Sequence, residues 1–398
     1  MPIAVYMLGL LIFAMTTSEF MVGGMMPELA KEFGVSISDI GYLISIYAIG
    51  MVIGGPMVTI GLLKVSKKKA LMTIAIFFLI GQIVGSIATS YEVMMVARII
   101  TGIASAAGFA VSIAFCVHLV EPQIRGRAAS IVLGGLMIAT VIGLPMSTMI
   151  SQYFGWRTSF WVVVGLVLLS GLMVQWLVPT LPKTESGSIR SEFTAFKNSQ
   201  LWAAFATSGL IIAATFAAFS YFTPIFTELT GFSASVVPMI MAVYGGATVI
   251  GNMITGRLAD KFTMQTLFIG LVLLTVSLLM FALFASNPII TIMSVIVLGL
   301  VGVPMNPAMA TRVMKTSNTG TLVNAIHGSI ISLGVGIGSS IGALTMDAGF
   351  GLISTLWVGF ILAVLGVISL LPFTRETFRK KTRSLNENHM NKGKSCVT

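Results

Sequence analysis

Two charged side chains, Glu19 and Arg98, interrupt stretches of this chain that are otherwise apolar. A lone charge in hydrocarbon costs several kcal/mol, so such a side chain usually faces a partner or a water-filled cavity. Burial opposes ionisation of a carboxyl group and a nearby arginine favours it, so a glutamate in this setting can bind and release a proton. We predict that Glu19 is a proton acceptor and that Arg98 is its charge partner. The alternative is a permanent ion pair that fastens two helices together.

The amino-acid composition indicates that lipid, and not water, surrounds most of this chain. Of the 398 residues, 56% are apolar and only 9% are charged, and the mean hydropathy is +0.99. A soluble domain carries about 25% charged residues, so this chain cannot cover a surface in contact with water. A soluble enzyme and a disordered chain are therefore excluded. The two cysteines are too few for the disulfide framework of a secreted protein.

Long apolar runs separated by short polar breaks predict an all-α integral membrane protein. Each run has roughly the 20 residues with which a helix crosses about 30 Å of hydrocarbon, and the runs lack the alternation of membrane strands. The first run has neither the basic start nor the cleavage site of a signal peptide, so we expect it to remain as a span. Twelve transmembrane helices are expected, at residues 3–26, 39–63, 70–89, 93–119, 128–151, 158–178, 201–223, 234–256, 264–285, 288–311, 321–346 and 351–372.

The rise of a helix places the two charges at similar depths. Glu19 lies about 15 residues into the first span, or about 22 Å from the edge at which the chain begins. Arg98 lies about five residues into the fourth span, which runs in the opposite direction, or about 8 Å from the opposite edge. In a slab of about 30 Å these depths coincide, so the two side chains can meet.

Lysine and arginine are distributed unevenly between the two sides of the predicted bundle. Of 23 such residues, Lys31 and Arg157 fall on the side away from the termini and Arg98 lies inside a span, which leaves 20 on the side of the termini. Cytoplasmic loops of membrane proteins carry this excess. We therefore expect both termini to be cytoplasmic in a multi-pass membrane protein. The net charge of +10 then reflects orientation and attraction to anionic membrane lipid, and no nucleic-acid partner is expected.

An internal repeat relates the two halves of the chain. Shifted by 197 residues without gaps, the second span aligns with the eighth: Tyr47 meets Tyr244, and residues 52–54 meet 249–251. Parallel repeats of six helices are a transporter architecture that holds its substrate between the halves, near the midplane. We predict two pseudo-symmetric six-helix bundles at 1–179 and 201–372, joined by a cytoplasmic linker at 180–200 and followed by a basic cytoplasmic tail at 373–398.

One face of the predicted seventh span combines aromatic and hydroxyl side chains. Phe216, Phe219, Ser220 and Thr223 follow the i, i+3, i+4, i+7 spacing of a single helical face, which suits a cavity for flat or amphipathic molecules. Aromatic side chains that face lipid are the alternative. His327 could relay protons, because histidine titrates near neutrality, or form an interhelical hydrogen bond. The expected substrate-binding residues are Phe20, Phe216, Phe219, Tyr244, Asn306 and His327.

Motifs of enzymes are absent from the sequence. It contains no HExxH, paired CxxC or GxSxG motif. The run at 393–395 resembles the end of a phosphate-binding loop, but Asn388 stands where that loop has its first glycine. We therefore expect no enzyme activity, no cofactor, no metal site and no drive by ATP.

Several short motifs resemble those of the major facilitator superfamily. Residues 256–261, GRLADK, match the loop motif of that family, and residues 98–102, RIITG, are similar to its fourth-span motif, in which the arginine is implicated in proton coupling. Residues 143–145, GLP, resemble the fifth-span motif of its antiporters. Residues 18–20, SEF, are similar to the bacterial twelve-helix drug–proton antiporter branch, which includes exporters of arabinose, other sugars and purine nucleosides.

The resemblance implies a monomeric secondary transporter of a bacterial plasma (inner) membrane, whose two halves rock about a central cavity. Its expected function is proton-coupled efflux, by antiport, of small organic molecules such as drugs, sugars or nucleosides, with Glu19 as the proton acceptor beside Arg98. Arg257 and Asp260 would hold the cytoplasmic gate. The residues expected to serve gating or structure are Gly102, Gly143, Pro145, Gly256, Arg257 and Asp260.

The chain departs from the family pattern in two places. By the 197-residue shift, Thr59 and Leu63 replace the glycine and the aspartate of the loop motif in the first half, and Ser147 and Thr148 stand where the fifth-span motif has glycines. Two other functions stay open on the sequence. One is a proton-coupled uptake symporter or facilitator of a small metabolite, and the other is a non-transporting membrane receptor or channel.

Overall fold

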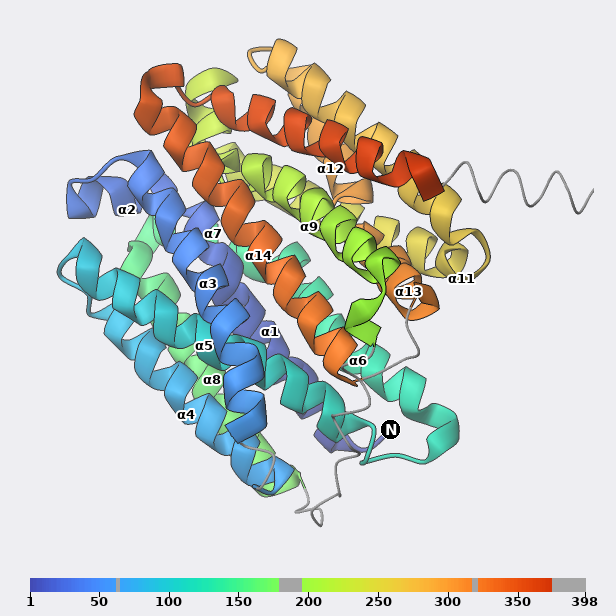
Figure 1. Cartoon of the computed structure of the whole chain (residues 1–398). Helices are drawn as coiled ribbons and strands as arrows, with labels where there is room; N and C mark the ends of the chain where they lie inside the picture. Colours follow the sequence, from blue (N-terminus) through green and yellow to red (C-terminus); the bar gives the residue numbers. More distant parts are fainter. Residues whose placement is uncertain (62–64, 179–194, 317–320, 374–398) are drawn as a thin grey trace, which may run out of the picture.

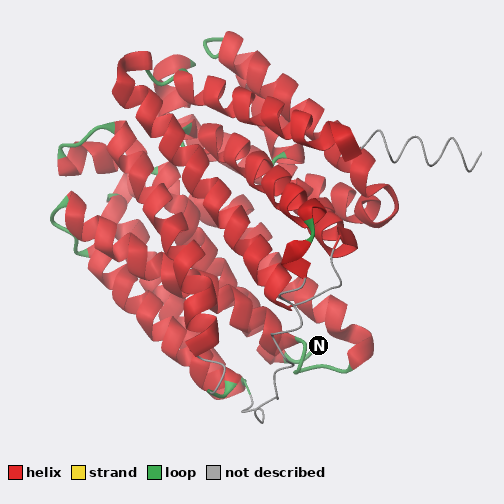
Figure 2. Ribbon diagram, viewed as in Figure 1, coloured by secondary structure: helices red, strands yellow, loops and turns green. Residues whose placement is uncertain are grey.

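The computed structural model describes residues 1–61, 65–178, 195–316 and 321–373. These residues form helices joined by short loops, and no strand occurs among them (Figure 2). The expected linker at 180–200 lies mostly outside the described residues, as does the basic tail after Phe373. The last residues of that expected linker belong to a helix that starts at Ser199.

The first half of the chain forms six spans, of which the fifth is interrupted. Its elements are α1 (Ile3–Gly24), α2 (Met26–Phe33), α3 (Ile37–Gly61), α4 (Lys67–Ser86), α5 (Tyr91–Cys116), η1 (Pro122–Ile124), α6 (Arg125–Ile138), η2 (Ala139–Gly143), α7 (Leu144–Phe154) and α8 (Trp156–Leu177). We call this unit the N-terminal half.

The second half repeats the pattern with more interruptions. Its elements are α9 (Ser199–Phe219), α10 (Phe222–Pro224), η4 (Ile225–Leu229), η5 (Ala234–Val236), α11 (Val237–Leu283), α12 (Pro288–Val301), η6 (Val303–Met305), α13 (Asn306–Thr316), α14 (Thr321–Thr345), η7 (Met346–Phe350) and a final span, Ser354–Phe373. We call this unit the C-terminal half.

The described residues contain eleven helices that are long and apolar enough to cross a membrane, where twelve spans were predicted. The difference lies in α11, whose 47 residues would extend about 70 Å if straight, more than twice the hydrocarbon thickness. Its backbone leaves the helical region at Phe262, with φ −128° and ψ 37°. The eighth and ninth predicted spans are therefore joined by a kink rather than by a loop.

Prolines interrupt three of the spans. A proline lacks the N–H that would bond to the carbonyl four residues earlier, and its ring crowds that turn. Pro145 follows the π-helix η2, Pro224 follows the break at Ser220 and Tyr221 between α9 and α10, and Pro304 follows the break at Gly302 between α12 and α13. Interrupted helices of this kind are tolerated in membranes where they face protein or a cavity.

The two halves lie side by side, with α3 of the first packed on α14 of the second (Figure 1), and with η2 and α7 packed on α11. Small residues allow close approach between helices. A methyl group on Gly102 would overlap the carbonyl oxygen of Tyr47, which explains how tightly α5 packs on α3. A methyl group on Gly245 would overlap the carbonyl oxygen of Thr140, so α11 meets η2 of the other half equally closely.

The spans have two common ends, which we name from the first helix. The inner end carries Ile3, and the outer end carries Gly24. Among the described lysines and arginines, Lys31 and Arg157 lie at the outer end and Arg98 lies within α5. All the others follow or precede spans at the inner end, which agrees with the asymmetry expected from the sequence.

Candidate functional site

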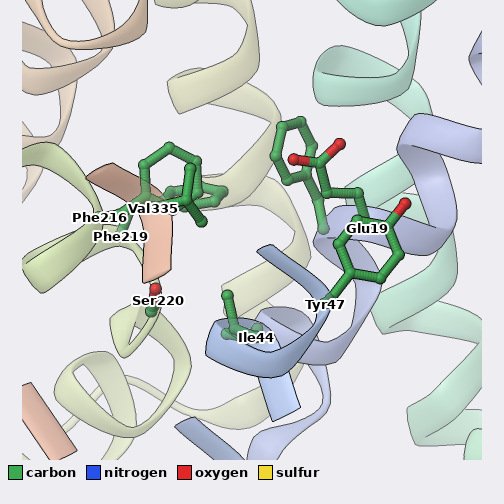
Figure 3. A pocket seen from close by; sticks show the side chains of 9 residues that line it. Glu19, Ile44, Tyr47, Phe216, Phe219, Ser220 and Val335 are labelled. Atoms are coloured by element: carbon green, nitrogen blue, oxygen red, sulfur yellow. The ribbon is translucent and has the colours of Figure 1, made fainter. Parts of the chain in front are cut away.

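A pocket lies between the two halves, and it contains the predicted proton acceptor. Glu19 and Tyr47 line one side of it, and Phe216, Phe219 and Val335 line the other (Figure 3). It has about 290 Å³ of space between atoms, including the part open at its mouth. This space is too small for a drug-sized ligand, so binding such a ligand requires the walls to part. The full lining is Glu19, Phe20, Gly23, Ile44, Tyr47, Phe216, Phe219, Ser220 and Val335.

Arg98 lies behind this pocket and ties three helices together. Its side chain is 1% exposed. One guanidinium nitrogen donates to the carbonyl oxygen of Ser18 at 2.7 Å and the other to that of Glu19 at 3.1 Å. Nε donates to the carbonyl oxygen of Leu43 at 3.5 Å, and the guanidinium carbon lies 4.1 Å from the centre of the Tyr47 ring. The buried charge is therefore satisfied by main-chain dipoles of α1 and α3 and by an aromatic face.

The carboxyl group of Glu19 is not held in an ion pair. Within the described part of the chain, the one ion pair with N···O below 4.0 Å joins Arg157 to Glu32, at 2.6 Å and near the outer end. Arg98 binds the main chain of Glu19 and not its carboxylate. The two charges are therefore neighbours, as their depths predicted, but the permanent ion pair considered as an alternative is not formed. The carboxyl group faces the pocket instead.

The aromatic residues expected to contact substrate form one cluster across the two halves. The ring of Phe20 lies 6.3 Å from that of Phe216 and 5.7 Å from that of Phe219, centre to centre. Tyr244 stacks on Phe219 at 4.9 Å, but it is not among the residues that line the pocket. Three of the four predicted aromatic residues thus reach the pocket, and Tyr244 supports them from behind.

Two other predicted substrate contacts do not reach this pocket. His327 is buried toward the inner end of α14, where its Nε2 lies 3.1 Å from Ser208 Oγ and its ring stacks on Phe205 at 5.9 Å. It forms the interhelical hydrogen bond that was the alternative to a relay. Asn306 is exposed at the start of α13. Neither side chain lines the space around Glu19.

The predicted gate residues lie at the inner end without closing it. Arg257 and Asp260 are exposed on α11, and neither forms an ion pair with a described residue. Lys315 of α13 donates to the main-chain oxygen of Asp260 at 2.8 Å and to Thr263 Oγ1 at 2.9 Å. Leu63, which takes the place of the aspartate in the first half, lies outside the described residues.

The predicted structural residues of the fourth and fifth spans lie at helix contacts. Gly102 packs on the main chain of Tyr47, as described above. A methyl group on Gly143 would overlap Thr17 Oγ1 of α1, and Pro145 begins the first turn of α7. Gly256 is different, because an added methyl group there would meet no described residue within 4 Å.

Hydrogen bonds between the halves concentrate toward the outer end. Thr223 Oγ1 donates to the carbonyl oxygen of Gly23 at 2.8 Å, directly beside the pocket. Ser339 Oγ donates to that of Gly41 at 2.9 Å. Farther out, Ser38 and Tyr42 of α3 both donate to the carboxylate of Asp347 in η7, the latter at 3.1 Å. The innermost such contact between described residues joins Ser332 to Met51, near the middle of α3. The structure is therefore closed at its outer end.

Sequence reasoning missed four of the pocket residues: Gly23, Ile44, Tyr47 and Val335. Spacing offers a signal for three of them. Gly23 lies one helical turn after Glu19, and Ile44 and Tyr47 lie one turn apart on α3. Which face of α3 meets α1 depends on helix rotation, and the sequence does not give it.

The described residues show no group that would hold a metal ion. No cluster of three or more histidine, cysteine, aspartate or glutamate side chains with that geometry occurs in residues 1–61, 65–178, 195–316 and 321–373. The charged groups near the pocket are Glu19, which lines it, and Arg98, which binds the main chain of Glu19.

Comparison with known proteins supports the same architecture. A chloramphenicol resistance protein of Streptomyces lividans is 28% identical over 378 residues, which is 94% of this chain and 96% of that protein. The inner membrane transport protein YdhP of Escherichia coli K12 is 29% identical over 92% of this chain and 94% of its own length. Both are similar over almost their whole length.

Two solved structures share the fold at low sequence identity. A bacterial homologue of the human lysosomal transporter Spinster superposes with a TM-score of 0.73 at 14% identity, covering 93% of this chain and 96% of its own. The human organic anion transporter MFSD10 superposes with a TM-score of 0.65 at 13% identity, covering 92% and 98%.

The family model of the Major Facilitator Superfamily matches residues 8–326 and 240–396. This family consists of membrane transporters of small molecules and not of enzymes, in agreement with the expectation from the motifs. With its helical fold, its pocket between two halves and this match, the chain belongs to the Major Facilitator Superfamily.

Proposed function

We propose that this transporter exports small organic molecules from the cytoplasm in exchange for protons. The observation that carries the proposal is the unpaired carboxyl group of Glu19, which faces a pocket between the halves while Arg98 lies behind it. A carboxyl group in that position can hold either a proton or a hydrogen-bond donor of the substrate. The similarity to a chloramphenicol resistance protein favours export of a drug-like molecule.

The exchange follows from competition for one carboxylate. With the inner end facing the cytoplasm, as the lysines and arginines favour, a substrate binds the ionised Glu19 from inside. The halves then close at the inner end and part at the outer end, where a proton replaces the substrate. Each proton that returns through the membrane potential releases about 2.3 kcal/mol per 100 mV, which drives the next export.

A symporter or a facilitator would use the same fold. Symport and antiport differ in whether the protein takes up or releases protons when substrate binds. In symport, substrate and proton bind together, so substrate binding takes up protons. In antiport, substrate binding releases them. A receptor or channel differs from both, because it would show no saturable exchange.

The test is transport by the purified protein in liposomes. We expect that chloramphenicol is driven against its gradient only when a proton gradient of opposite direction is imposed, and that its addition to the detergent-solubilised protein releases protons. Movement of chloramphenicol and protons in the same direction would replace antiport with symport. Flux that is insensitive to the proton gradient would leave a facilitator.

The contacts that close the outer end give a second prediction, which concerns the balance between closed and open conformations. A methyl group on Gly41 would overlap Tyr221 Oη, which is fully buried and donates to the carbonyl oxygen of Ser339 at 2.7 Å. Because this hydroxyl cannot move without losing its bond, Gly41→Ala is expected to shift the protein toward a state that is open at the outer end.

Spin labels at two exposed outer positions, Lys31 in the N-terminal half and Phe350 in the C-terminal half, measure this shift as a longer distance. The matched control is Gly165→Ala in α8, whose added methyl group meets no atom within 4 Å. Equal distance distributions in the two variants would show that Gly41 does not limit outer closure.

A further inference from the structure

The seventh span breaks at the pocket, and the break has a local cause. Pro224 cannot donate to the carbonyl oxygen of Ser220 four residues earlier, so α9 ends at Phe219 and the chain turns at Ser220 and Tyr221 before α10 begins. Transporters of several folds place such breaks where substrate binds, because the half-helix ends and the unwound main chain offer polar groups there. Ser220 is therefore held at the edge of the pocket by the main chain itself.

The hydroxyl group of Ser220 differs from the buried hydroxyl groups of α9 that precede it. Thr207, Ser208 and Thr215 all donate to the carbonyl oxygen four residues earlier, at 2.8 to 3.0 Å. Ser220 is 1% exposed, and its Oγ has no hydrogen-bond partner among the described residues. Buried polar groups in proteins are nearly always hydrogen-bonded, so an exception calls for a partner that the protein alone does not supply.

The surroundings of Ser220 indicate what that partner is. Ser220 lines the same pocket as Glu19 but comes from the opposite half (Figure 3). The rings of Phe20, Phe216 and Phe219 line the pocket as well. The pocket thus has polar groups from both halves, Glu19 and Tyr47 from the first and Ser220 from the second, and an apolar lining between the halves. A ligand that matches it has a flat apolar body with a polar group at each end.

We propose that Ser220 is a specificity-determining residue that binds the second polar end of the substrate. The inference rests on the proposed function and names the class of molecule carried. The end beside Glu19 carries a hydroxyl, amide or amine donor, because a carboxylate accepts. The end beside Ser220 carries a hydrogen-bond acceptor such as a nitro or carbonyl oxygen, to which the hydroxyl donates. Flat molecules that are polar at one end only are poor substrates.

Two pairs of probes test this selectivity, each pair differing in one terminal acceptor. The first pair is chloramphenicol and its analogue with hydrogen in place of the nitro group. The second pair is inosine and purine riboside, which lacks the carbonyl oxygen of the base. For the transported pair, we expect the wild type to bind the acceptor-bearing member about tenfold more tightly, the usual scale for one buried hydrogen bond. Ser220→Ala is expected to bring that ratio close to one.

The matched control is Ser170→Ala in α8. Ser170 is as deeply buried, but its hydroxyl donates to the carbonyl oxygen of Val167 within its own helix, so the ratio should stay at the wild-type value. A second readout is the melting temperature. Because the Ser220 hydroxyl bonds to no residue that the structure describes, Ser220→Ala should not lower the Tm, whereas loss of a structural contact would.

The outcomes separate the two proposals. If the wild type transports none of the four probes, the proposed export function fails and the inference fails with it. If the wild type transports one pair but Ser220→Ala leaves the ratio unchanged, or if its Tm falls, only the role of Ser220 is overturned. A collapsed ratio at an unchanged Tm supports both.

Discussion

Replacing Glu19 with glutamine is expected to abolish uphill export while leaving downhill movement of the substrate intact. Glutamine has nearly the shape of a protonated glutamate, so the pocket keeps its lining, but it cannot release a proton. With one proton exchanged for a neutral molecule, 100 mV and one pH unit together sustain a gradient of about 500-fold. In Glu19→Gln that gradient should fall to about one.

Binding should lose its pH dependence in the same variant. In the wild type, a proton and the donor group of the substrate compete for one carboxylate, so affinity falls as the pH is lowered through the titration of Glu19. In Glu19→Gln there is no competing proton, and affinity should stay constant. Binding calorimetry with a transported probe over a pH series checks both curves.

The matched control is Glu228→Gln, which neutralises an exposed carboxyl group at the outer end. It should retain both the gradient and the pH dependence of the wild type. Should Glu19→Gln still concentrate the probe against its gradient, another group carries the proton and the proposed coupling site is misplaced.

The sequence predicted the depth of Glu19 and Arg98 in the membrane, but it did not predict which atoms of the two residues are in contact. Helical rise alone brought Glu19 and Arg98 to one level, and the structure places Arg98 against the main chain of Glu19. Pairing of the two charged groups themselves depends on how α1 and α5 are rotated and on side-chain torsions. The sequence carries no direct record of either, so the choice between a free carboxyl group and an ion pair required the structure.

Polar residues within spans were harder to interpret than charged ones. His327 and Asn306 matched the residue types of a cavity, but His327 is bonded to Ser208 and Asn306 is exposed away from the pocket. A histidine or asparagine in a membrane helix has the same pattern whether it meets a ligand or a neighbouring helix. The break at Ser220 is the opposite case, because the position of Pro224 four residues later would have predicted it.

The junction between the eighth and ninth predicted spans shows that hydropathy does not distinguish a loop from a kinked helix. Residues 257–263 are polar enough to end a span, and the structure turns there, but the chain turns by leaving helical geometry at Phe262 and not through a loop. Hydropathy measures which residues leave the hydrocarbon. It does not measure whether the backbone hydrogen bonds continue through the turn.

Replacing Arg98 is expected to lower stability more than any other single change near the pocket. The guanidinium group bonds to the carbonyl oxygens of Ser18, Glu19 and Leu43 and stacks on Tyr47. Arg98→Met removes all these contacts and leaves buried acceptors without a donor, at a cost of about 1–3 kcal/mol for each group left unsatisfied. We expect a total loss of about 3 kcal/mol, measured by denaturant unfolding in detergent.

The variant Arg98→Lys tests whether stability depends on the positive charge of Arg98 or on the shape of its guanidinium group. Lysine keeps the positive charge near Glu19, but its compact ammonium group cannot reproduce the planar fork that reaches α1 and α3 together. If the charge alone mattered, Arg98→Lys would keep both wild-type stability and the pH dependence of binding. We expect instead that stability falls by about 2 kcal/mol. Arg157 provides the control, because it makes similar contacts at a partly exposed site: it pairs with Glu32, donates to the carbonyl oxygen of Ala88 at 2.9 Å and lies over the Trp156 ring. Water can replace these contacts, so Arg157→Lys should cost less than about 1 kcal/mol. Equal losses in the two lysine variants would mean that burial of the Arg98 guanidinium group contributes nothing to stability, and that packing alone holds α1, α3 and α5 together.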